Sequence, residues 1–341
     1  MDDTHPPDRY VLYGGLGSPY SMKMRGVLRF RRLPHDWVQL GTPEAPEVLS
    51  RVKVPVIPVL RFPDGRHAND STPLIRELER LHPGERSVVP DDPAQAFLAA
   101  LLEDMADEWG TKAMFLYRWL RERDQRQTSE WLAFDRLAGE GREAIMGHAS
   151  RFRDRQVGRM VLVGCTPQNA PLVEASADRV MALLEAHVTE ERFLFGGRPS
   201  IADFAWMGQL SQLANDPTAC EHLRERFPLV LRWLMHLDDA SGVEGRWRAP
   251  DAPTSPAVAG LLAVAAEVYF PFLEANAAAI AAGRDTFAFE AWGLRYAQGT
   301  FKYQVRCLAE LRDAYRSLPA AARARVDADL PAAAREALAR G

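Results

Sequence analysis

Hydrophobic and polar positions follow two different rhythms along this chain. In the first 81 residues, short β-branched and aromatic runs at Tyr10–Tyr13, Trp37–Leu40 and Val59–Phe62 predict strands. Apolar residues spaced three to four apart at Met22–Phe30 and Pro73–Leu81 predict two helices. This part of the chain is therefore expected to combine a small sheet with helices.

The stretch from Val56 to Ile75 carries the densest local signals. A Pro-Asp-Gly turn at 63–65 follows the third strand, because proline presets φ and glycine accepts a positive φ. Arg66–Asn69 is then expected to pair back as a hairpin strand. Asp70 and Ser71 begin a helix, whose unpaired N–H groups and partial positive charge favour a carboxylate or phosphate ligand.

From residue 93 onward the periodicity is helical. A polar linker, Glu85–Asp92, separates the part with strands and helices from the helical part, and Pro250–Pro256 forms a second boundary. Helices are predicted at Ala94–Glu122, Thr128–Ala138, Arg151–Val163 and Leu172–Val188. Ser200 and Asp203 form a capping box of the Ser-x-x-Asp type at the start of another helix.

These patterns divide the chain into three parts: a mixed domain at 8–84, a helical domain at 92–245 and a helical extension at 250–341. In the extension, Leu261, Val264, Val268 and Phe272 share one helical face, and Phe301, Val305, Leu308, Leu311 and Tyr315 share another. Amphipathic helices of this kind cannot remain exposed, so the extension is expected to pack on the helical domain.

Two motif regions together resemble the glutathione S-transferase family: the proline–hairpin–Asp-Ser stretch and the capping box that follows Phe193-Leu-Phe-Gly. The resemblance implies a thioredoxin-like β-α-β-β-α domain that binds glutathione, followed by an all-helical domain. It assigns the backbone of Ile57 to the cysteinyl part of the peptide, and Asp70 and Ser71 to its γ-glutamyl end. Pro58 is the preferred cis-proline because its spacing to Asp70 leaves one hairpin, and Pro55 is the competing choice.

Glutathione must be ionised to react, and a free thiol has a pKa near ~8.5. A hydroxyl beside a helix N-terminus can stabilise the thiolate. The stretch Ser18-Pro-Tyr-Ser-Met-Lys-Met-Arg is similar to the family's active-site segment, so Ser18 is the candidate. The simpler interpretation is that Ser18 only caps a helix. Tyr13 is the alternative hydroxyl, and Ser21 is a third.

The resemblance also suggests side chains that could bind the other groups of glutathione and the electrophile. Lys53 or Arg51 could meet the glycine carboxylate, and Asp104 or Asp107 could reach the amino group, although solvent-exposed charges are the simpler interpretation for all four. An electrophile pocket is expected between the Ser18 loop and the long helix. Its candidate residues are Trp109, Met114, Tyr117 and Arg118, although an aromatic stripe at this spacing is more often part of a core.

Composition excludes several other classes of protein. The chain has 341 residues, a net charge of −4 and 47% hydrophobic residues, which fits a globular protein without a basic nucleic-acid surface. The N-terminus lacks the pattern of a secretory signal, and the apolar stretch at 257–283 contains charges, so it is interpreted as a packed helix instead of a membrane span. The three cysteines form no paired motif, which predicts a reduced, cytoplasmic protein with no metal.

The combined prediction is a glutathione transferase-like enzyme that adds the glutathione thiolate to a hydrophobic electrophile, by conjugation or isomerisation. Family members that reduce disulfides use a cysteine at the place of Ser18, and no cysteine precedes Cys165, so a cysteine-dependent oxidoreductase is not expected. The resemblance implies a homodimer. The alternative function is a non-catalytic module with the same fold that serves binding or assembly.

Overall fold

The computed structural model describes residues 8–39, 41–84 and 86–340. Three residues of predicted segments lie outside the described residues: Leu40, the last residue of a predicted strand, Glu85, the first residue of the predicted linker, and Gly341, the last residue of the predicted extension. The N-terminal domain contains the strands β1 (Tyr10–Gly14), β2 (His35–Gln39), β3 (Val59–Arg61) and β4 (His67–Asn69). Its helices are α1 (Pro19–Phe30), α2 (Ala45–Ser50) and α3 (Ser71–Leu81).

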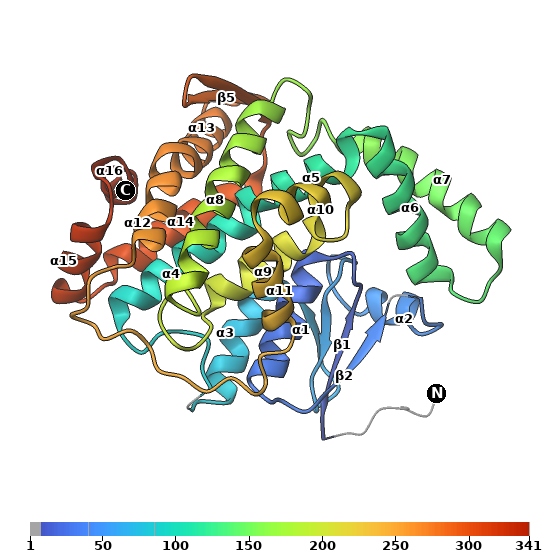
Figure 1. The fold of residues 1–341 in the computed structure, drawn as a ribbon, viewed down its shortest axis with the longest axis horizontal. Helices are drawn as coiled ribbons and strands as arrows, with labels where there is room; N and C mark the ends of the chain where they lie inside the picture. Colours follow the sequence, from blue (N-terminus) through green and yellow to red (C-terminus); the bar gives the residue numbers. More distant parts are fainter. Residues whose placement is uncertain (1–7, 40, 85, 341) are drawn as a thin grey trace.

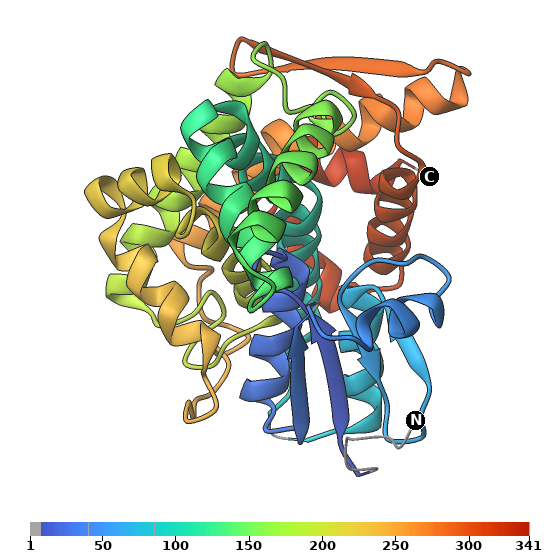
Figure 2. The ribbon, with the colours of Figure 1, turned by 90° about the vertical axis from the view of Figure 1, so that its right-hand side faces the viewer.

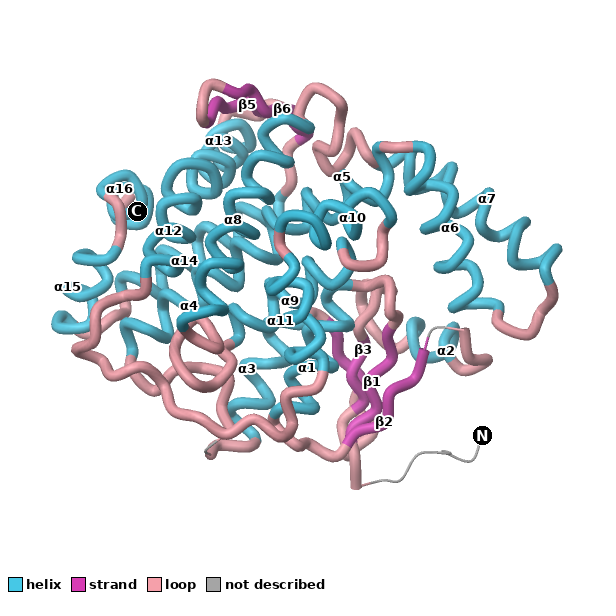
Figure 3. Tube along the Cα trace, in the orientation of Figure 1, coloured by secondary structure: helices cyan, strands magenta, loops and turns pink. Residues whose placement is uncertain are grey.

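The four strands form one mixed sheet in the order β2-β1-β3-β4. Figure 3 shows the strands in magenta, with β1, β2 and β3 labelled. β1 runs parallel to β2 and antiparallel to β3, and β4 pairs with β3 as a hairpin. Parallel β1 and β2 require a crossover connection, which α1 provides. The predicted thioredoxin-like plan is confirmed, and the short helix α2 is an element that the hydrophobic pattern did not predict.

Alternation of side chains along β1 divides the domain into two cores. Leu12 and Leu60 point to the face covered by α1 and α3, in the main hydrophobic core. Val11, Tyr13 and Val59 point to the opposite face, where they pack with Val48 of α2 in a separate small core. The position of Tyr13 in β1 therefore places its side chain on the face of the sheet that α2 covers.

The helical domain follows, and Figure 1 shows its helices stacked above the sheet domain. Its first long helix consists of α4 (Pro93–Met105), the π-helical turn η1 (Ala106–Gly110) and α5 (Thr111–Leu120). The remaining helices are α6 (Glu122–Leu137), α7 (Arg142–Arg159), α8 (Ala170–Glu190), α9 (Ile201–Leu213), α10 (Pro217–Arg226) and α11 (Pro228–Asp238). Helix α10 was not predicted, and α7 begins nine residues earlier than predicted.

Helix α9 joins the two domains. The capping box at its start is present as predicted: Ser200 Oγ accepts from the Asp203 amide at 3.4 Å, and Asp203 Oδ2 accepts from the Ser200 amide at 2.8 Å. The middle of α9 packs on α1, where a Cβ on Gly208 would come within 2.5 Å of the Pro19 carbonyl. This close approach places the loop before α1 directly against the helical domain.

The extension contains α12 (Pro256–Val264), the π-helical turn η2 (Ala265–Tyr269), α13 (Phe270–Ala281), β5 (Thr286–Ala291), β6 (Leu294–Gly299), α14 (Lys302–Arg316), α15 (Ala320–Asp329) and α16 (Ala332–Ala339). The predicted helical extension is confirmed, and it also contains a hairpin of β5 and β6 that the hydrophobic pattern did not predict. Trp292 and Gly293 both have positive φ in its two-residue turn, the geometry that such hairpins favour.

The extension packs on the helical domain, as its apolar faces require. Phe272 of α13 and Tyr296 of β6 each lie about 5.2 Å, centroid to centroid, from the ring of Trp109. Figure 2 shows the orange and red extension reaching down to the light-blue part of the sheet domain. There Arg76 of α3 forms an ion pair with Glu310 of α14 at 3.3 Å.

Among the described residues, Pro256–Ala281 is the one helix long and apolar enough to cross a membrane by length and composition. Its most apolar window is 67% buried inside the protein. A packed core helix, as predicted for this stretch, accounts for that burial.

Candidate functional site

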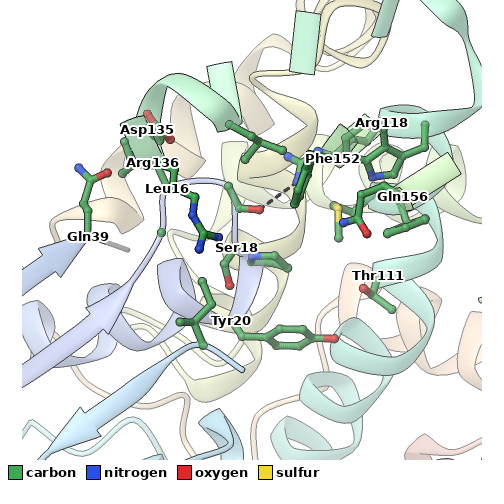
Figure 4. Close-up of a pocket in the computed structure, with 18 of the residues that line it drawn as sticks. Leu16, Ser18, Tyr20, Gln39, Thr111, Arg118, Asp135, Arg136, Phe152 and Gln156 are labelled. Carbon is green, nitrogen blue, oxygen red and sulfur yellow. Dashed lines mark hydrogen bonds between the residues drawn. The ribbon is translucent and has the colours of Figure 1, made fainter. Parts of the chain in front are cut away.

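Two cavities lie where the sheet domain meets the helices. The acidic cavity, of about 550 Å³, is formed by the loop before β3, the start of α3, η1 and the start of α14. The aromatic cavity, of about 370 Å³, is formed by the loop before α1 together with α5, α6 and α7 (Figure 4). Tyr20 and Ile57 line both cavities, so the two adjoin at these residues.

All five residues predicted to bind glutathione line the acidic cavity: Lys53, Ile57, Pro58, Asp70 and Ser71. The Ile57–Pro58 peptide bond is cis, which decides between the two prolines in favour of Pro58. The Asn69 side chain donates to the carbonyls of Val54 at 2.7 Å and Val56 at 3.2 Å. The loop that presents Ile57 is therefore fastened to β4.

Asp70 occupies an unusual backbone conformation at the start of α3. Its φ of 80° lies in a region that non-glycine residues rarely adopt, and such conformations cluster at ligand-binding sites. One carboxylate oxygen accepts from the Tyr303 hydroxyl at 3.3 Å. Burial raises the pKa of Asp70.

The opposite wall of the acidic cavity is made by Asp104, Asp107 and Glu108, which come from α4 and η1. The interpretation of Asp104 and Asp107 as exposed surface acids is wrong, because Asp107 is buried, Asp104 is half-buried, and both line this cavity. Asp104 accepts from the Tyr269 hydroxyl at 2.6 Å, and Asp107 accepts from Lys23 at 2.6 Å.

Charge in this wall is only partly compensated. Lys23 is completely buried and also pairs with Glu103, so one ammonium serves two carboxylates. The Oδ1 atom of Asp107 is buried on the side of the Gln209 side chain. Burial raises the pKa of Asp107 to about 6 and that of Glu108 to about 7. The wall can therefore accept a positively charged group from a ligand.

Ser18 lies at the rim of the aromatic cavity, beside the N-terminus of α1 (Figure 4). It is the N-cap of that helix, and its Oγ accepts from the Ser21 amide at 3.3 Å. The capping bond uses an oxygen lone pair and leaves the hydroxyl proton available to a ligand. The capping role is thus present, and it is compatible with the predicted role in stabilising a thiolate.

The two alternative hydroxyls are placed differently. Tyr13 is 4% exposed and points into the small core beneath α2, where its ring stacks on His67. Ser21 is completely buried. Neither residue lines the aromatic or the acidic cavity, as far as the described residues define them.

Of the four candidates for the electrophile pocket, Met114 and Arg118 line the aromatic cavity. Arg118 donates to Asp216 at 2.9 Å, to Gln212 at 2.8 Å and to the Gly17 carbonyl at 2.9 Å, so it also fixes the Ser18 loop. Aromatic and aliphatic side chains supply most of the remaining wall: Leu16, Phe115, Trp119, Leu132 and Phe152.

Trp109 and Tyr117 do not line this cavity, so the prediction that they belong to the electrophile pocket is wrong. Trp109 points toward the extension and donates to Ser176 at 2.9 Å. Tyr117 is buried and stacks on His222. Residues at helical spacing along η1 and α5 face different neighbours, and the apolar pattern alone does not distinguish a cavity wall from a core.

Sequence reasoning missed two groups of cavity residues. Tyr20 separates the two cavities and donates its hydroxyl to the Asp107 carbonyl at 3.0 Å; its place in the Ser18-Pro-Tyr segment was the available signal. Phe301, Tyr303 and Arg306 of the extension line the acidic cavity. No local signal identifies these three, because they are more than 230 residues from Asp70 in sequence.

No cluster of three or more histidine, cysteine or acidic side chains suited to a metal occurs among the described residues. His222, two residues after Cys220 in the sequence, pairs with Asp178 at 2.6 Å.

Comparison with known proteins gives two matches to family models. Residues 12–86 match the glutathione S-transferase N-terminal domain, and residues 147–234 match the glutathione S-transferase C-terminal domain. The extension lies outside both matches. No curated protein matches the chain.

Several solved structures resemble the chain at low identity. A glutathione S-transferase from Methylobacterium radiotolerans, in complex with glutathione sulfonate, is 21% identical over 72% of this chain and 99% of that one, with a TM-score of 0.44. One from Rhodospirillum rubrum is 18% identical over 74% and 91%, with a TM-score of 0.41. A beta-etherase from a Sphingobium strain is 16% identical over 74% and 98%, with a TM-score of 0.46.

Proposed function

We propose a glutathione-dependent function for this chain, which belongs to the glutathione S-transferase family through its N-terminal and C-terminal domains. The chain binds glutathione in the acidic cavity and presents the thiolate to a hydrophobic electrophile in the aromatic cavity. The observation that carries this proposal is the convergence of five predicted glutathione contacts in one cavity, with Ser18 lining the adjoining one.

Glutathione is oriented by its ends and by its backbone. The N-terminus of α3, at Asp70 and Ser71, receives the γ-glutamyl group, because its amides and dipole favour a carboxylate. The backbone of Ile57 pairs with the cysteinyl residue. Lys53, exposed at the cavity rim, meets the glycine carboxylate. Because Ile57 lines both cavities, a cysteinyl group paired with it has its thiol directed toward Ser18.

Ser18 stabilises the thiolate by donating its hydroxyl proton to sulfur. The N-terminus of α1 adds a partial positive charge at the same place. Both effects favour the anion over the neutral thiol and therefore lower the pKa of bound glutathione. Tyr20 does not compete for this role, because its hydroxyl already donates to the Asp107 carbonyl.

The aromatic cavity selects the electrophile. Phe115, Trp119 and Phe152 present rings, and Met114 adds a polarisable wall, so a planar apolar molecule fits best. Once the thiolate has attacked, the bond between sulfur and carbon forms, and a leaving group departs or a proton is taken from solvent. Disulfide reduction is not proposed, because no cysteine among the described residues lines either cavity.

The proposal includes a cytoplasmic location and a homodimer, which are usual for the family. The extension contributes to the cavity within one chain, so a single chain already contains every contact described above.

The test combines glutathione binding with turnover. Isothermal titration should show binding to the wild type, and Ser71→Ala should weaken it roughly 5–50-fold by removing a hydrogen bond to a charged group. Ser317→Ala, which changes a serine after α14, is the control. An aromatic electrophile such as 1-chloro-2,4-dinitrobenzene should then be conjugated. Binding without any conjugation would favour the non-catalytic module, and absence of binding would refute both.

A further inference from the structure

One face of α7 forms part of the aromatic cavity. His148, Phe152 and Gln156 line it, and their spacing of four residues places them on the same face of the helix. The rings of His148 and Phe152 stack with their centroids 6.1 Å apart. Arg151 and Arg155 follow these two residues by three positions, so they lie on the next ridge of the helix, beside the cavity. The Arg155 guanidinium lies over the Phe152 ring, 5.0 Å from its centroid.

A third arginine approaches the mouth of the cavity from α6, which packs on α7. Arg136 lines the cavity, and Figure 4 shows it across from Phe152, with Ser18 between them. Like Arg151 and Arg155, it is exposed, so its guanidinium is accessible to a ligand that enters the cavity. Two neighbouring helices therefore present cations around one opening.

These cations are not neutralised by neighbouring acids. In the described part of the chain, none of Arg136, Arg151 and Arg155 forms a hydrogen bond or an ion pair with a carboxylate. Burial and the same three arginines lower the pKa of His148, and no carboxylate opposes them. Asp135 is the one acid that lines the aromatic cavity among the described residues, and burial alone raises its pKa. The mouth is therefore positively charged, although the net charge of the chain is −4.

This arrangement suits an aromatic ligand that carries a negative charge at one edge. The rings of Phe115, Trp119 and Phe152 bury an apolar ring, whereas a carboxylate at the mouth can accept two N–H bonds from a guanidinium. The cations have a second effect, because the proposed nucleophile is itself an anion. Positive charge at the mouth offsets the repulsion between the thiolate and a negatively charged ligand.

We propose that Arg136, together with Arg151 and Arg155, binds the carboxylate of an aromatic electrophile and thereby determines which electrophiles the chain uses. This deepens the proposed function and rests on it. The carboxylate lies at the mouth, the ring lies in the aromatic cavity, and the reacting carbon faces the thiolate beside Ser18. The sulfur–carbon bond forms, and the leaving group departs with the electron pair of the bond that breaks.

A matched pair of electrophiles isolates the effect of the charge. 4-Chloro-3,5-dinitrobenzoate carries a carboxylate, and 4-chloro-3,5-dinitrobenzamide is its neutral counterpart. In both compounds, the glutathione sulfur replaces chloride at the same carbon. The kcat/KM for each, relative to its uncatalysed rate with glutathione, is measured for the full chain and for Arg136→Gln. Arg159→Gln, which removes an exposed cation of α7 that does not line the cavity, is the control.

The wild type should prefer the benzoate to the benzamide. Arg136→Gln should lower this preference roughly 3–10-fold, through a higher KM for the benzoate, because a binding contact is lost. A variant with both Arg151→Gln and Arg155→Gln should lower it by a smaller factor, and Arg159→Gln should keep the wild-type preference. Added salt should also reduce the preference of the wild type, because exposed charges are screened.

An unchanged preference in Arg136→Gln would overturn the role of this residue. A wild type that conjugates the benzamide at least as well as the benzoate would overturn the preference for an anion, and it would leave the proposed function intact. If neither compound is conjugated, calorimetry with the unreactive 3,5-dinitrobenzoate and 3,5-dinitrobenzamide decides separately. A preference for the benzoate that Arg136→Gln reduces would then support the carboxylate contact although the proposed turnover is refuted, and no preference would refute both.

Discussion

Single residues at this site combine a structural role with a chemical one. Ser18 caps α1 and also lines the aromatic cavity, and Asp70 begins α3 in a rare backbone conformation while it faces the acidic cavity. The sequence motif predicted both positions, because cap residues and ligand contacts coincide at helix N-termini. It did not predict the environment of Asp107 and Glu108, whose burial depends on helices far away in the chain.

The carboxyl of Glu108 makes folding stability depend on pH. Burial raises its pKa to about 7 from 4.5, with Lys112 opposing the shift and Asp107 adding to it. A carboxyl with a higher pKa in the folded state stabilises the fold below its unfolded pKa, and this contribution is lost as pH rises through about 7. The loss is at most on the order of 3 kcal/mol, at about 1.4 kcal/mol per pKa unit.

Glu108→Gln cannot ionise, so it should melt a few degrees above the wild type at about pH 8, with a smaller difference at about pH 5. Thermal unfolding followed by circular dichroism at both pH values measures the effect. Glu290→Gln, which changes an exposed carboxylate of β5, is the control. A wild-type melting temperature that rises from pH 5 to pH 8 relative to Glu108→Gln would contradict the assignment.

At the scale of elements, the capping box of α9 is a clear example of local sequence deciding structure. Asp203 is completely buried and accepts from the amides of Ser200 at 2.8 Å and Leu194 at 2.9 Å. Asp203→Ala leaves two buried N–H groups unpaired, so it should lower the free energy of unfolding by about 2–4 kcal/mol and slow refolding. Urea denaturation and refolding kinetics measure both effects, and Asp154→Ala, which changes an exposed residue, is the control. Unchanged stability of Asp203→Ala would show that the capping box does not stabilise α9.

Other elements were predictable only in part. Buried and exposed residues alternate in Thr286–Ala291, where Phe287 and Ala291 are buried. Together with the Trp-Gly turn that follows, this alternation indicates a hairpin. The apolar residues at helical spacing in the extension do not indicate it. Arg306, in contrast, lies on a helix whose pattern predicts only amphipathicity. Its place in the cavity depends on how α14 packs on α3 and α4, which no local pattern contains.

For the whole molecule, the extension is expected to be inseparable from the helical domain. Trp109 is 3% exposed and contacts the rings of Phe272, Phe289 and Tyr296, all from the extension. Deleting residues 250–341 would expose this aromatic surface, so the truncated protein should aggregate or be insoluble. Size-exclusion chromatography of the truncation checks this, and a monodisperse product with full activity would contradict it.

The predicted homodimer is a separate property of the whole molecule. Light scattering at micromolar concentration should give twice the chain mass of 38.1 kDa. The extension already contacts Asp70 and Arg76 around α3, so a dimer must form on a surface that these contacts leave open. A measured mass of one chain would refute the dimer, and it would leave the glutathione site unaffected.

The most direct measurement for the proposed function is the pKa of the glutathione thiol when it is bound. Titration of the thiolate absorbance should give a wild-type pKa below the free value of ~8.5. Ser18→Ala should return the thiol pKa toward that value and lower turnover roughly 10–1000-fold, whereas Tyr13→Phe should resemble the wild type. A thiol pKa and turnover that survive in Ser18→Ala, or that change in Tyr13→Phe instead, would contradict the assignment of Ser18 as the group that stabilises the thiolate.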